Sequence, residues 1–248
     1  MTTGVTLRVS VLTPTRDRPH GIALAERWMA HQTRPPDEWI IVDDGLEPAP
    51  LTQGQIHLRR AAEPGCGGAQ SLCRNLLWGL PRVTGDVLVF WEDDDYYAPT
   101  HLERILAQLQ RPGVLIAGDD QQRYYNVAHR RWRIFKNRGA CLCQTAIRRD
   151  GLAIVERAAC QSLSRRSYGV DAGIWSLMPR HAKALDRTGT VVGIKGLPGQ
   201  PGLGVGHRPI GPEWQADLDG RVLREWIGPD AAVYHASGQP ALRSVVTS

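Results

Sequence analysis

Lysine is scarce in this chain of 248 residues and 27.4 kDa. It occurs only at Lys136, Lys183 and Lys195, whereas lysine and arginine together number 30 against 25 acidic residues, a formal net charge of +5. Nearly all the positive charge is therefore arginine, whose guanidinium suits bidentate contacts to phosphate, although a general compositional bias toward arginine gives the same numbers. This mildly basic composition permits an anionic partner without requiring one.

Cysteine pairs and long apolar runs are missing as well. The five cysteines contain no CxxC pair, so the sequence indicates neither a disulfide framework nor a zinc site. The longest strongly apolar run, residues 87–91, is far too short to span a bilayer, and the first residues lack the basic and apolar stretches of a signal peptide. We therefore expect a protein that has no membrane span and resides in the reducing cytoplasm.

The first half of the chain alternates apolar strand-like runs with helix-like stretches. Such alternation is typical of a mostly parallel sheet flanked by helices, the α/β class. With 42% hydrophobic residues the chain can bury a substantial core. The predicted strands cover residues 7–13, 38–42, 56–59, 86–91 and 114–117, and the predicted helices cover residues 15–31, 69–80 and 99–110.

The second half is less regular. Aromatic and basic residues over 123–138 predict a hairpin that turns near Ala128 and His129, and residues 174–185 predict a helix. Residues 193–212 are dense in glycine and proline, so we expect a long loop there rather than a regular element. With no internal repeat and no clear linker, the simplest expectation is one domain over residues 1–248.

Polar clusters directly follow three of the predicted strands. They are residues 14–17 (PTRD), 43–45 (DDG) and 92–95 (EDDD). In open α/β sheets, ligands bind outside the carboxyl ends of the strands. Four successive carboxylates after a buried strand are costly unless a cation or several donors offset their charge. Oxygen ligands favour Mg²⁺ or Mn²⁺, whose coordination substrate phosphates often complete, so the sequence predicts a metal-bridged diphosphate site.

An ordered set of segments over residues 7–180 resembles glycosyltransferase family 2 and its GT-A fold. The segments are VSVLTPTRDRP, EWIIVDDG, CRNLLWGL, GDVLVFWEDDDYYAPTHLE and SYGVDAGIW. The resemblance implies a metal-dependent, inverting enzyme that moves a sugar from a nucleoside-diphosphate sugar, with UDP as the expected nucleotide, to a hydroxyl acceptor. It also implies a donor-binding half over about 1–118 and an acceptor-side half over about 119–248.

The same resemblance implies roles for individual residues. Donor contacts fall on the first loop, the second-strand aspartate, the Arg-Asn pair of the next helix and the first part of the DxD-like run. The implied donor-binding residues are Pro14, Thr15, Arg16, Asp44, Arg74, Glu92 and Asp93. Asp94 is the implied metal ligand. The chain departs from the family pattern in having Glu92 where aspartate is usual.

A general base and a further metal ligand are implied later in the chain. Asp171 matches the acid at the start of the acceptor-side helix, where the family has its general base, although an aspartate there can also cap the helix. His207 and His235 are the candidates for a late histidine ligand, and we favour His207. Asp43-Asp44-Gly45 can equally form a simple turn after a strand, and residues 92–95 a solvated acidic loop.

The basic and aromatic residues between positions 119 and 168 indicate which class of acceptor the protein would bind. Arginines interleaved with Tyr124, Trp132 and Phe135 suit phosphate contact with base stacking, so a nucleic acid bearing a modified base is a candidate acceptor. An edge hairpin with solvated arginines explains the same pattern. Two other functions are a non-catalytic nucleic-acid-binding module and a sugar-phosphate nucleotidyltransferase. The latter would need a glycine-rich loop after the first strand, and TPTRDRP has no glycine.

Overall fold

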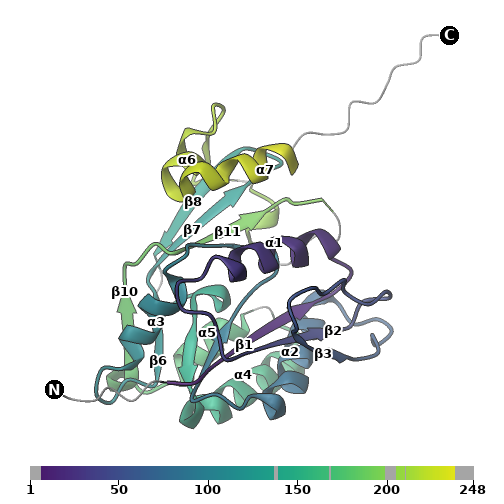
Figure 1. The fold of residues 1–248 in the computed structure, drawn as a ribbon, viewed down its shortest axis with the longest axis vertical. Helices are drawn as coiled ribbons and strands as arrows, with labels where there is room; N and C mark the ends of the chain where they lie inside the picture. The colour runs from purple at the N-terminus through teal and green to yellow at the C-terminus, as the bar shows by residue number, and fades with distance from the viewer. Residues whose placement is uncertain (1–6, 137–138, 168, 199–204, 210, 238–248) are drawn as a thin grey trace.

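The structure, a computed structural model, describes residues 7–136, 139–167, 169–198, 205–209 and 211–237. Two sheets form its framework (Figure 1). In spatial order the first sheet contains β10 (Lys183–Asp186), β6 (Ile116–Asp119), β9 (Ala146–Arg148), β4 (Val87–Phe90), β1 (Val9–Thr15), β2 (Glu38–Asp43) and β3 (Ile56–Arg59). The second contains β12 (Gln215–Ala216), β8 (Arg131–Lys136), β7 (Gln121–Asn126), β11 (Val191–Lys195) and β5 (Tyr96–Tyr97).

The first sheet is mostly parallel, as the sequence predicts. β1 runs parallel to β2 and β4, β2 to β3, and β10 to β6, whereas β9 is antiparallel to both β4 and β6. The helices are α1 (Pro19–Ala30), α2 (Gly68–Gly79), α3 (His101–Leu109), α4 (Leu152–Arg165), α5 (Val170–Leu177), α6 (Arg221–Ile227) and α7 (Ala231–Ser237). Within the described residues, none of these helices is long and apolar enough to span a bilayer.

Helices cover both faces of the first sheet, which explains the continuous apolar runs of its central strands. Because successive strand residues point to opposite faces, Val87 and Val89 join one core cluster while Leu88 and Phe90 join the other. The first cluster contains residues of α1, α3 and the second sheet, and the other contains residues of α2, α4 and α5. The second sheet therefore packs on the α1 side of the first, with α6 and α7 over its outer part (Figure 1).

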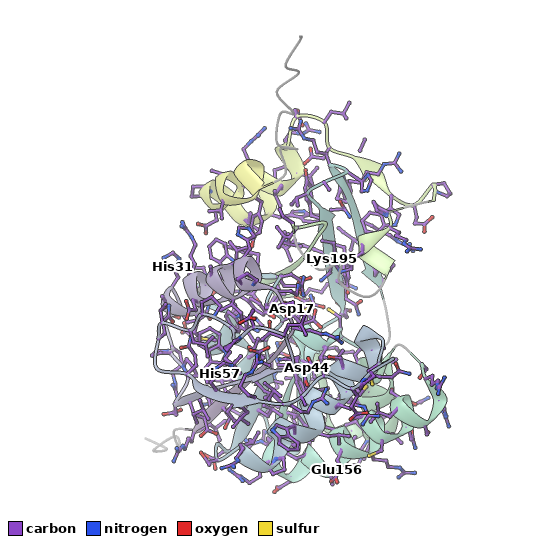
Figure 2. The ribbon with its side chains drawn as sticks, turned by 90° about the vertical axis from the view of Figure 1, so that its right-hand side faces the viewer. Asp17, His31, Asp44, His57, Glu156 and Lys195 are labelled. Atoms are coloured by element: carbon purple, nitrogen blue, oxygen red, sulfur yellow. The ribbon has the colours of Figure 1, made fainter. Side chains whose placement is uncertain are left out.

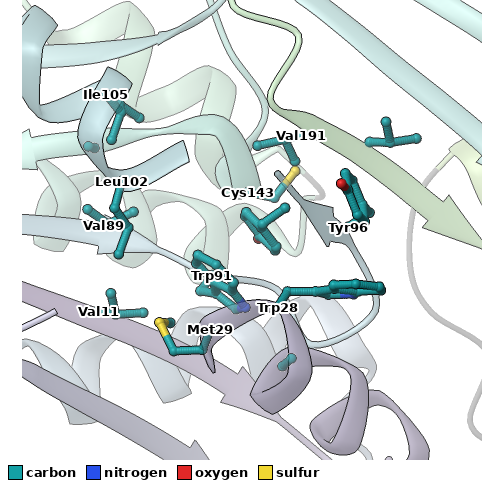
Figure 3. Packing of buried hydrophobic residues seen from close by; sticks show 14 of the residues in the cluster. Val11, Trp28, Met29, Val89, Trp91, Tyr96, Leu102, Ile105, Cys143 and Val191 are labelled. Atoms are coloured by element: carbon teal, nitrogen blue, oxygen red, sulfur yellow. The ribbon is translucent and has the colours of Figure 1, made fainter. Parts of the chain in front are cut away.

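Aromatic residues anchor the segment that connects the two sheets. Trp91 follows β4 and stacks on Tyr97 of β5 with ring centroids 3.6 Å apart, and Tyr96 packs edge-on against Trp28 of α1. Figure 3 shows Trp28, Trp91 and Tyr96 in the core between α1 and the strands. Both ends of the acidic segment 92–95 are therefore fixed in the core.

One prediction for the second half is wrong, and the start of another is shifted. The helix expected over 174–185 is instead α5, which ends at Leu177, followed by the strand β10. Pro179 disfavours a helical backbone at the residue before it, and Met178 is extended. Residues 193–195 of the expected loop 193–212 belong instead to β11, where they pair with Tyr124, Tyr125 and Asn126 of β7. Residues 199–204 and 210 of that loop lie outside the described residues.

Candidate active site

The acidic run 92–95 crosses from the first sheet to the second. β4 ends at Phe90 and β5 begins at Tyr96, so the four carboxylates lie at the carboxyl end of a central strand. Asp93, Asp94 and Asp95 are each at most 3% exposed, whereas Glu92 is partly exposed. Buried carboxylates at this density require cations or hydrogen-bond donors close by.

Arg18 and Thr15 satisfy the first part of the run. Thr15 ends β1 and donates from Oγ1 to Asp93 at 2.7 Å. Arg18 lies directly before α1, and its two terminal nitrogens donate to Asp93 at 2.6 Å and to Asp94 at 2.7 Å. One guanidinium therefore holds two adjacent carboxylates, a geometry that its planar fork allows.

Lys195 reaches the same run from β11 of the second sheet, and His207 reaches it from the short 3-10 turn Val205–His207 that follows β11 in the chain. Lys195 Nζ lies 2.8 Å from Asp95 Oδ1 and 3.4 Å from both carboxylate oxygens of Asp94. His207 Nε2 lies 3.8 Å from Asp94 Oδ2. Figure 2 shows Lys195 on the side of the second sheet, with Asp17 and Asp44 below it. Asp94 is thus the residue at which the contributions of both sheets meet.

The pKa values differ along the run because the partners differ. Burial raises the pKa of Asp94, but the nearby charges of Arg18, Lys195 and His207 outweigh it and hold that pKa well below its usual range. Burial raises the pKa of Asp95 to about 6, because with the neighbouring charge of Asp94 it outweighs the lowering effect of Lys195. Burial, with the charge of Lys195, lowers the pKa of His207 to about 4. At neutral pH Asp94 is therefore a carboxylate and His207 a neutral imidazole.

A cavity of about 370 Å³ opens in front of these residues. The loop after β1 contributes Pro14, Thr15, Arg16 and Arg18, the acidic run contributes Glu92, Asp93 and Asp94, and the second sheet and its following loop contribute Lys195 and His207. The remaining wall comes from the start of α2 and the loop before it, with Cys66, Gly68, Ser71, Leu72 and Asn75. One cavity thus contains most of the side chains to which the sequence analysis assigns donor or metal binding.

Asp44 lies beneath this cavity rather than in its wall. It is 1% exposed and accepts hydrogen bonds from Ser71 and Asn75 of α2 and from Arg60 at 2.9 Å. Ser71 and Asn75 themselves line the cavity. Asp44 therefore orients the side chains that face the cavity.

Asp43 braces the turn that the sequence predicts after β2. Its Oδ1 accepts from the Gly45 amide at 2.8 Å, and its Oδ2 accepts from the Ala49 amide at 2.8 Å and from Arg59 at 2.6 Å. Burial raises the pKa of Asp43, but these donors and His57 outweigh it and lower the pKa below its usual value. The carboxylate thereby holds the loop that lies beside the site.

Replacing Asp43 with asparagine should lower the free energy of unfolding by about 2 kcal/mol at pH 7, the scale of hydrogen bonds to a charged group. Because the folded pKa is depressed, this stability is present above the unfolded pKa of about 3.9 and is lost as pH falls through the folded pKa. Urea unfolding at pH 7 and about pH 3 should show the difference from wild type shrinking in acid. Asp150→Asn, at an exposed position, is the matched control. A pH-independent difference would contradict this role.

Besides Asp44, three other predicted site residues do not line the described cavity. Arg74 of α2 donates to Glu63 at 2.6 Å. Asp171 is the second residue of α5, is partly buried, and accepts from the Ala172 amide at 2.8 Å. Burial raises the pKa of Asp171, partly offset by that amide. His235 is in α7, but its side chain lies outside the described residues.

The chemistry of Asp94 and His207 fits a divalent metal ion. A charged carboxylate oxygen and a neutral imidazole nitrogen are accepted ligand types for Mn²⁺. Two atoms that each lie about 2.1 Å from one ion are at most about 4.2 Å apart, and Asp94 Oδ2 and His207 Nε2 are separated by 3.8 Å. A second group, Glu92, Asp95 and Cys143, has ligand atoms within 4.8 Å of one another, and Lys195 Nζ lies against its two carboxylates as it does against Asp94.

Sequence reasoning gave no role to Arg18. Its position could have indicated that role: Arg18 lies four residues after Pro14, in the loop that follows the first predicted strand, and this loop faces the acidic run. The sequence also gave no reason to place Lys195 on the carboxylates, since it lies about 100 residues away and reaches them only through the pairing of β11 with β7 and β5.

The family model of glycosyl transferase family 2 matches residues 10–169, more than half of the chain. No curated protein sequence matches. A mannosyltransferase, PcManGT from Pyrobaculum calidifontis in complex with GDP-Man and Mn²⁺, is 14% identical with a TM-score of 0.49, covering 77% of this chain and 57% of that one.

A second solved structure is similar to the same extent. TarS 1-349 from S. aureus is 11% identical with a TM-score of 0.49, covering 75% of this chain and 60% of that one. Its complex with UDP is matched over 46% of this chain and 36% of that one, at 17% identity and a TM-score of 0.37. This chain therefore spans about three fifths or less of the length of these solved chains.

Proposed function

This chain belongs to glycosyltransferase family 2, and we propose that it transfers a sugar from a nucleoside-diphosphate sugar, with UDP as the expected nucleotide, to a hydroxyl acceptor. The observation that carries this proposal is Asp94, a buried carboxylate in the wall of a 370 Å³ cavity. Arg18, Lys195 and His207 surround it. A cavity with both carboxylates and cations in its wall suits a diphosphate that is bound with a metal ion.

The binding part of the proposal uses the groups in the cavity wall. Thr15, Arg16 and Asn75 lie on the side where the family resemblance expects the nucleotide, and Asp93 and Glu92 lie beside the acidic centre. Asp94 and His207 would hold Mn²⁺ or Mg²⁺, which when bound supplies positive charge to the diphosphate. We assign donor binding to residues 1–118 together with these later residues, within a single domain over 1–248.

The chemical step is proposed as an in-line displacement with inversion. The acceptor oxygen forms a bond to the anomeric carbon while the bond from that carbon to the diphosphate oxygen breaks and the nucleoside diphosphate leaves. The acceptor proton passes to a carboxylate, for which Asp171 is the proposed base. Arg18 and Lys195 lie where they can stabilise the negative charge of the leaving group.

A screen of nucleotide sugars tests the proposal. Ligands that bind the native state raise the melting temperature by mass action. We expect one or a few nucleoside-diphosphate sugars to raise it, more strongly with Mn²⁺ than with EDTA, and the matching nucleoside monophosphates to raise it less. The absence of any shift with UDP-, GDP- and dTDP-sugars would contradict a sugar-nucleotide donor.

A nucleic acid bearing a modified base is the more specific acceptor suggested by residues 123–138. In the folded protein Arg130 and Arg131 donate to the Leu218 and Pro209 carbonyls, and Arg133 pairs with Glu213 at 2.6 Å. These partners compete with phosphate contacts. If nucleic acid is the acceptor, wild-type binding to it should weaken steeply as salt rises, because counterions are released. Fluorescence anisotropy with DNA and RNA at two salt concentrations measures this, and salt-independent or absent binding leaves a small-molecule or carbohydrate acceptor.

A further inference from the structure

A single buried lysine reaches the acidic run from the second sheet. Lys195 is the last residue of β11 and is 5% exposed. Its Nζ contacts Asp95 at 2.8 Å, Asp94 at 3.4 Å and Glu92 at 3.8 Å. Burying an ammonium costs several kcal/mol unless opposite charges compensate it, and here three carboxylates do so. The three surrounding carboxylates therefore favour a positively charged side chain at position 195.

The surroundings of Lys195 fit a lysine side chain specifically. Gly206 packs on its stem, and a Cβ on that glycine would approach Lys195 Cγ to 2.6 Å. The Lys195 carbonyl accepts from the Val127 amide at 2.8 Å, which fixes its backbone. Only three of the 30 basic residues of the chain are lysine. The compact ammonium of lysine acts as a point charge with three rotatable donors, whereas the guanidinium of arginine is a larger planar fork.

After this pairing, part of the negative charge of residues 92–95 remains uncompensated. Residues 92–95 carry four carboxyl groups, and Arg18 and Lys195 bring two fixed positive charges into contact with them. The cluster is therefore partly neutralised before any metal ion binds. Lys195 also lines the cavity proposed for the diphosphate. Lys195 thus belongs both to the carboxylate cluster and to the wall that an anionic ligand would meet.

We propose that Lys195 is the resident cation of this site: it holds Asp94 and Asp95 in the donor-free protein and contacts an oxygen of the diphosphate when a donor binds. This inference rests on the proposed function. Lys195 then supplies part of the charge that the diphosphate requires. Diphosphate binding is consequently strengthened by Mn²⁺ but does not depend on it, and Lys195 competes with Mn²⁺ for Asp94 in the free protein.

Calorimetric titrations of a Lys195→Met variant test both consequences. With EDTA present, wild type should bind UDP or GDP, and Lys195→Met should bind at least about tenfold more weakly, the scale of one lost charge-assisted contact. Titrated with Mn²⁺ alone, Lys195→Met should bind the ion at least about tenfold more tightly than wild type, because one competing positive charge is gone. Lys136→Met, at an exposed position on β8, is the matched control and should behave as wild type.

The outcomes separate this inference from the proposed function. Equal Mn²⁺ affinity and equal diphosphate affinity in EDTA for the two proteins would overturn the role of Lys195. If the variant does not fold, the wild-type protein alone tests the role of Lys195. Wild-type binding of UDP or GDP with Mn²⁺, but no binding with EDTA, would also overturn that role. If wild type binds neither nucleotide under any condition, the proposed function fails, while the titration with Mn²⁺ alone still tests the competition at Asp94.

Discussion

Replacing Asp94 with asparagine should abolish the Mn²⁺-dependent part of nucleoside-diphosphate binding and lower sugar transfer by about 10² or more, the usual scale for losing one electrostatic group at a reacting centre. Asparagine keeps the size of the side chain, but it removes the charge that Arg18, Lys195 and His207 surround. Calorimetric titration with UDP or GDP, with and without Mn²⁺, measures the nucleotide affinity, and initial rates measure the rate of sugar transfer.

The control for this variant is another aspartate that forms a single ion pair. Asp120 pairs with Arg187 at 3.2 Å at the start of β7, and Asp120→Asn should leave binding and transfer near wild type. Thermal unfolding in EDTA establishes that the Asp94 variant is folded. A folded Asp94→Asn protein with unchanged Mn²⁺-dependent affinity would remove Asp94 as a metal ligand.

Asp171→Asn should lower sugar transfer by roughly 10² or more while leaving donor affinity close to wild type, if Asp171 is the base. An acceptor hydroxyl is a weak nucleophile until its proton is removed, and asparagine cannot accept that proton. The variant keeps the side-chain size and can still accept from the Ala172 amide. Separate measurement of donor binding and of the transfer rate distinguishes a base from a donor contact.

A purely structural role for Asp171 predicts a different result. Gly169 is the N-cap of α5, so Asp171 lies within the first helical turn, where its charge interacts with the helix dipole. Asn would then cost less than about 1 kcal/mol of stability and little activity. Asp150→Asn, at an exposed position before α4, controls for the loss of one negative charge. Near-normal transfer by Asp171→Asn would direct the search to other carboxylates of the site.

The first sheet was predictable because its strands are apolar on both faces. β1, β2 and β4 lie between the two core clusters, so most of their residues are apolar, although β1 also contains Ser10 and Thr13. The ends of these runs indicated the carboxyl edge of the sheet and hence most of the cavity wall. The predicted strand boundaries differ from the observed ones by about two residues; β1, for example, covers 9–15, whereas the sequence predicts a strand over 7–13.

The later elements were harder to predict because long-range pairing determines them. β9 has only three residues, and it is a strand because it lies between β4 and β6. β10 follows a helix and a proline within an apolar stretch whose composition also suits a continuous helix. The sequence analysis assigned no element to residues 152–165, which form α4 against α2 and α5.

The place of β9 in the first sheet has a consequence for synthesis on the ribosome. β4 ends at residue 90, but the strand that covers its second edge begins at residue 146. At about 5–20 residues per second, a nascent chain spends roughly 3–11 s with that apolar edge available before its partner has been made. Unpaired strand edges promote aggregation, so the nascent chain is open to misassociation at β4 during this interval. Slow translation of residues 91–146 would lengthen it.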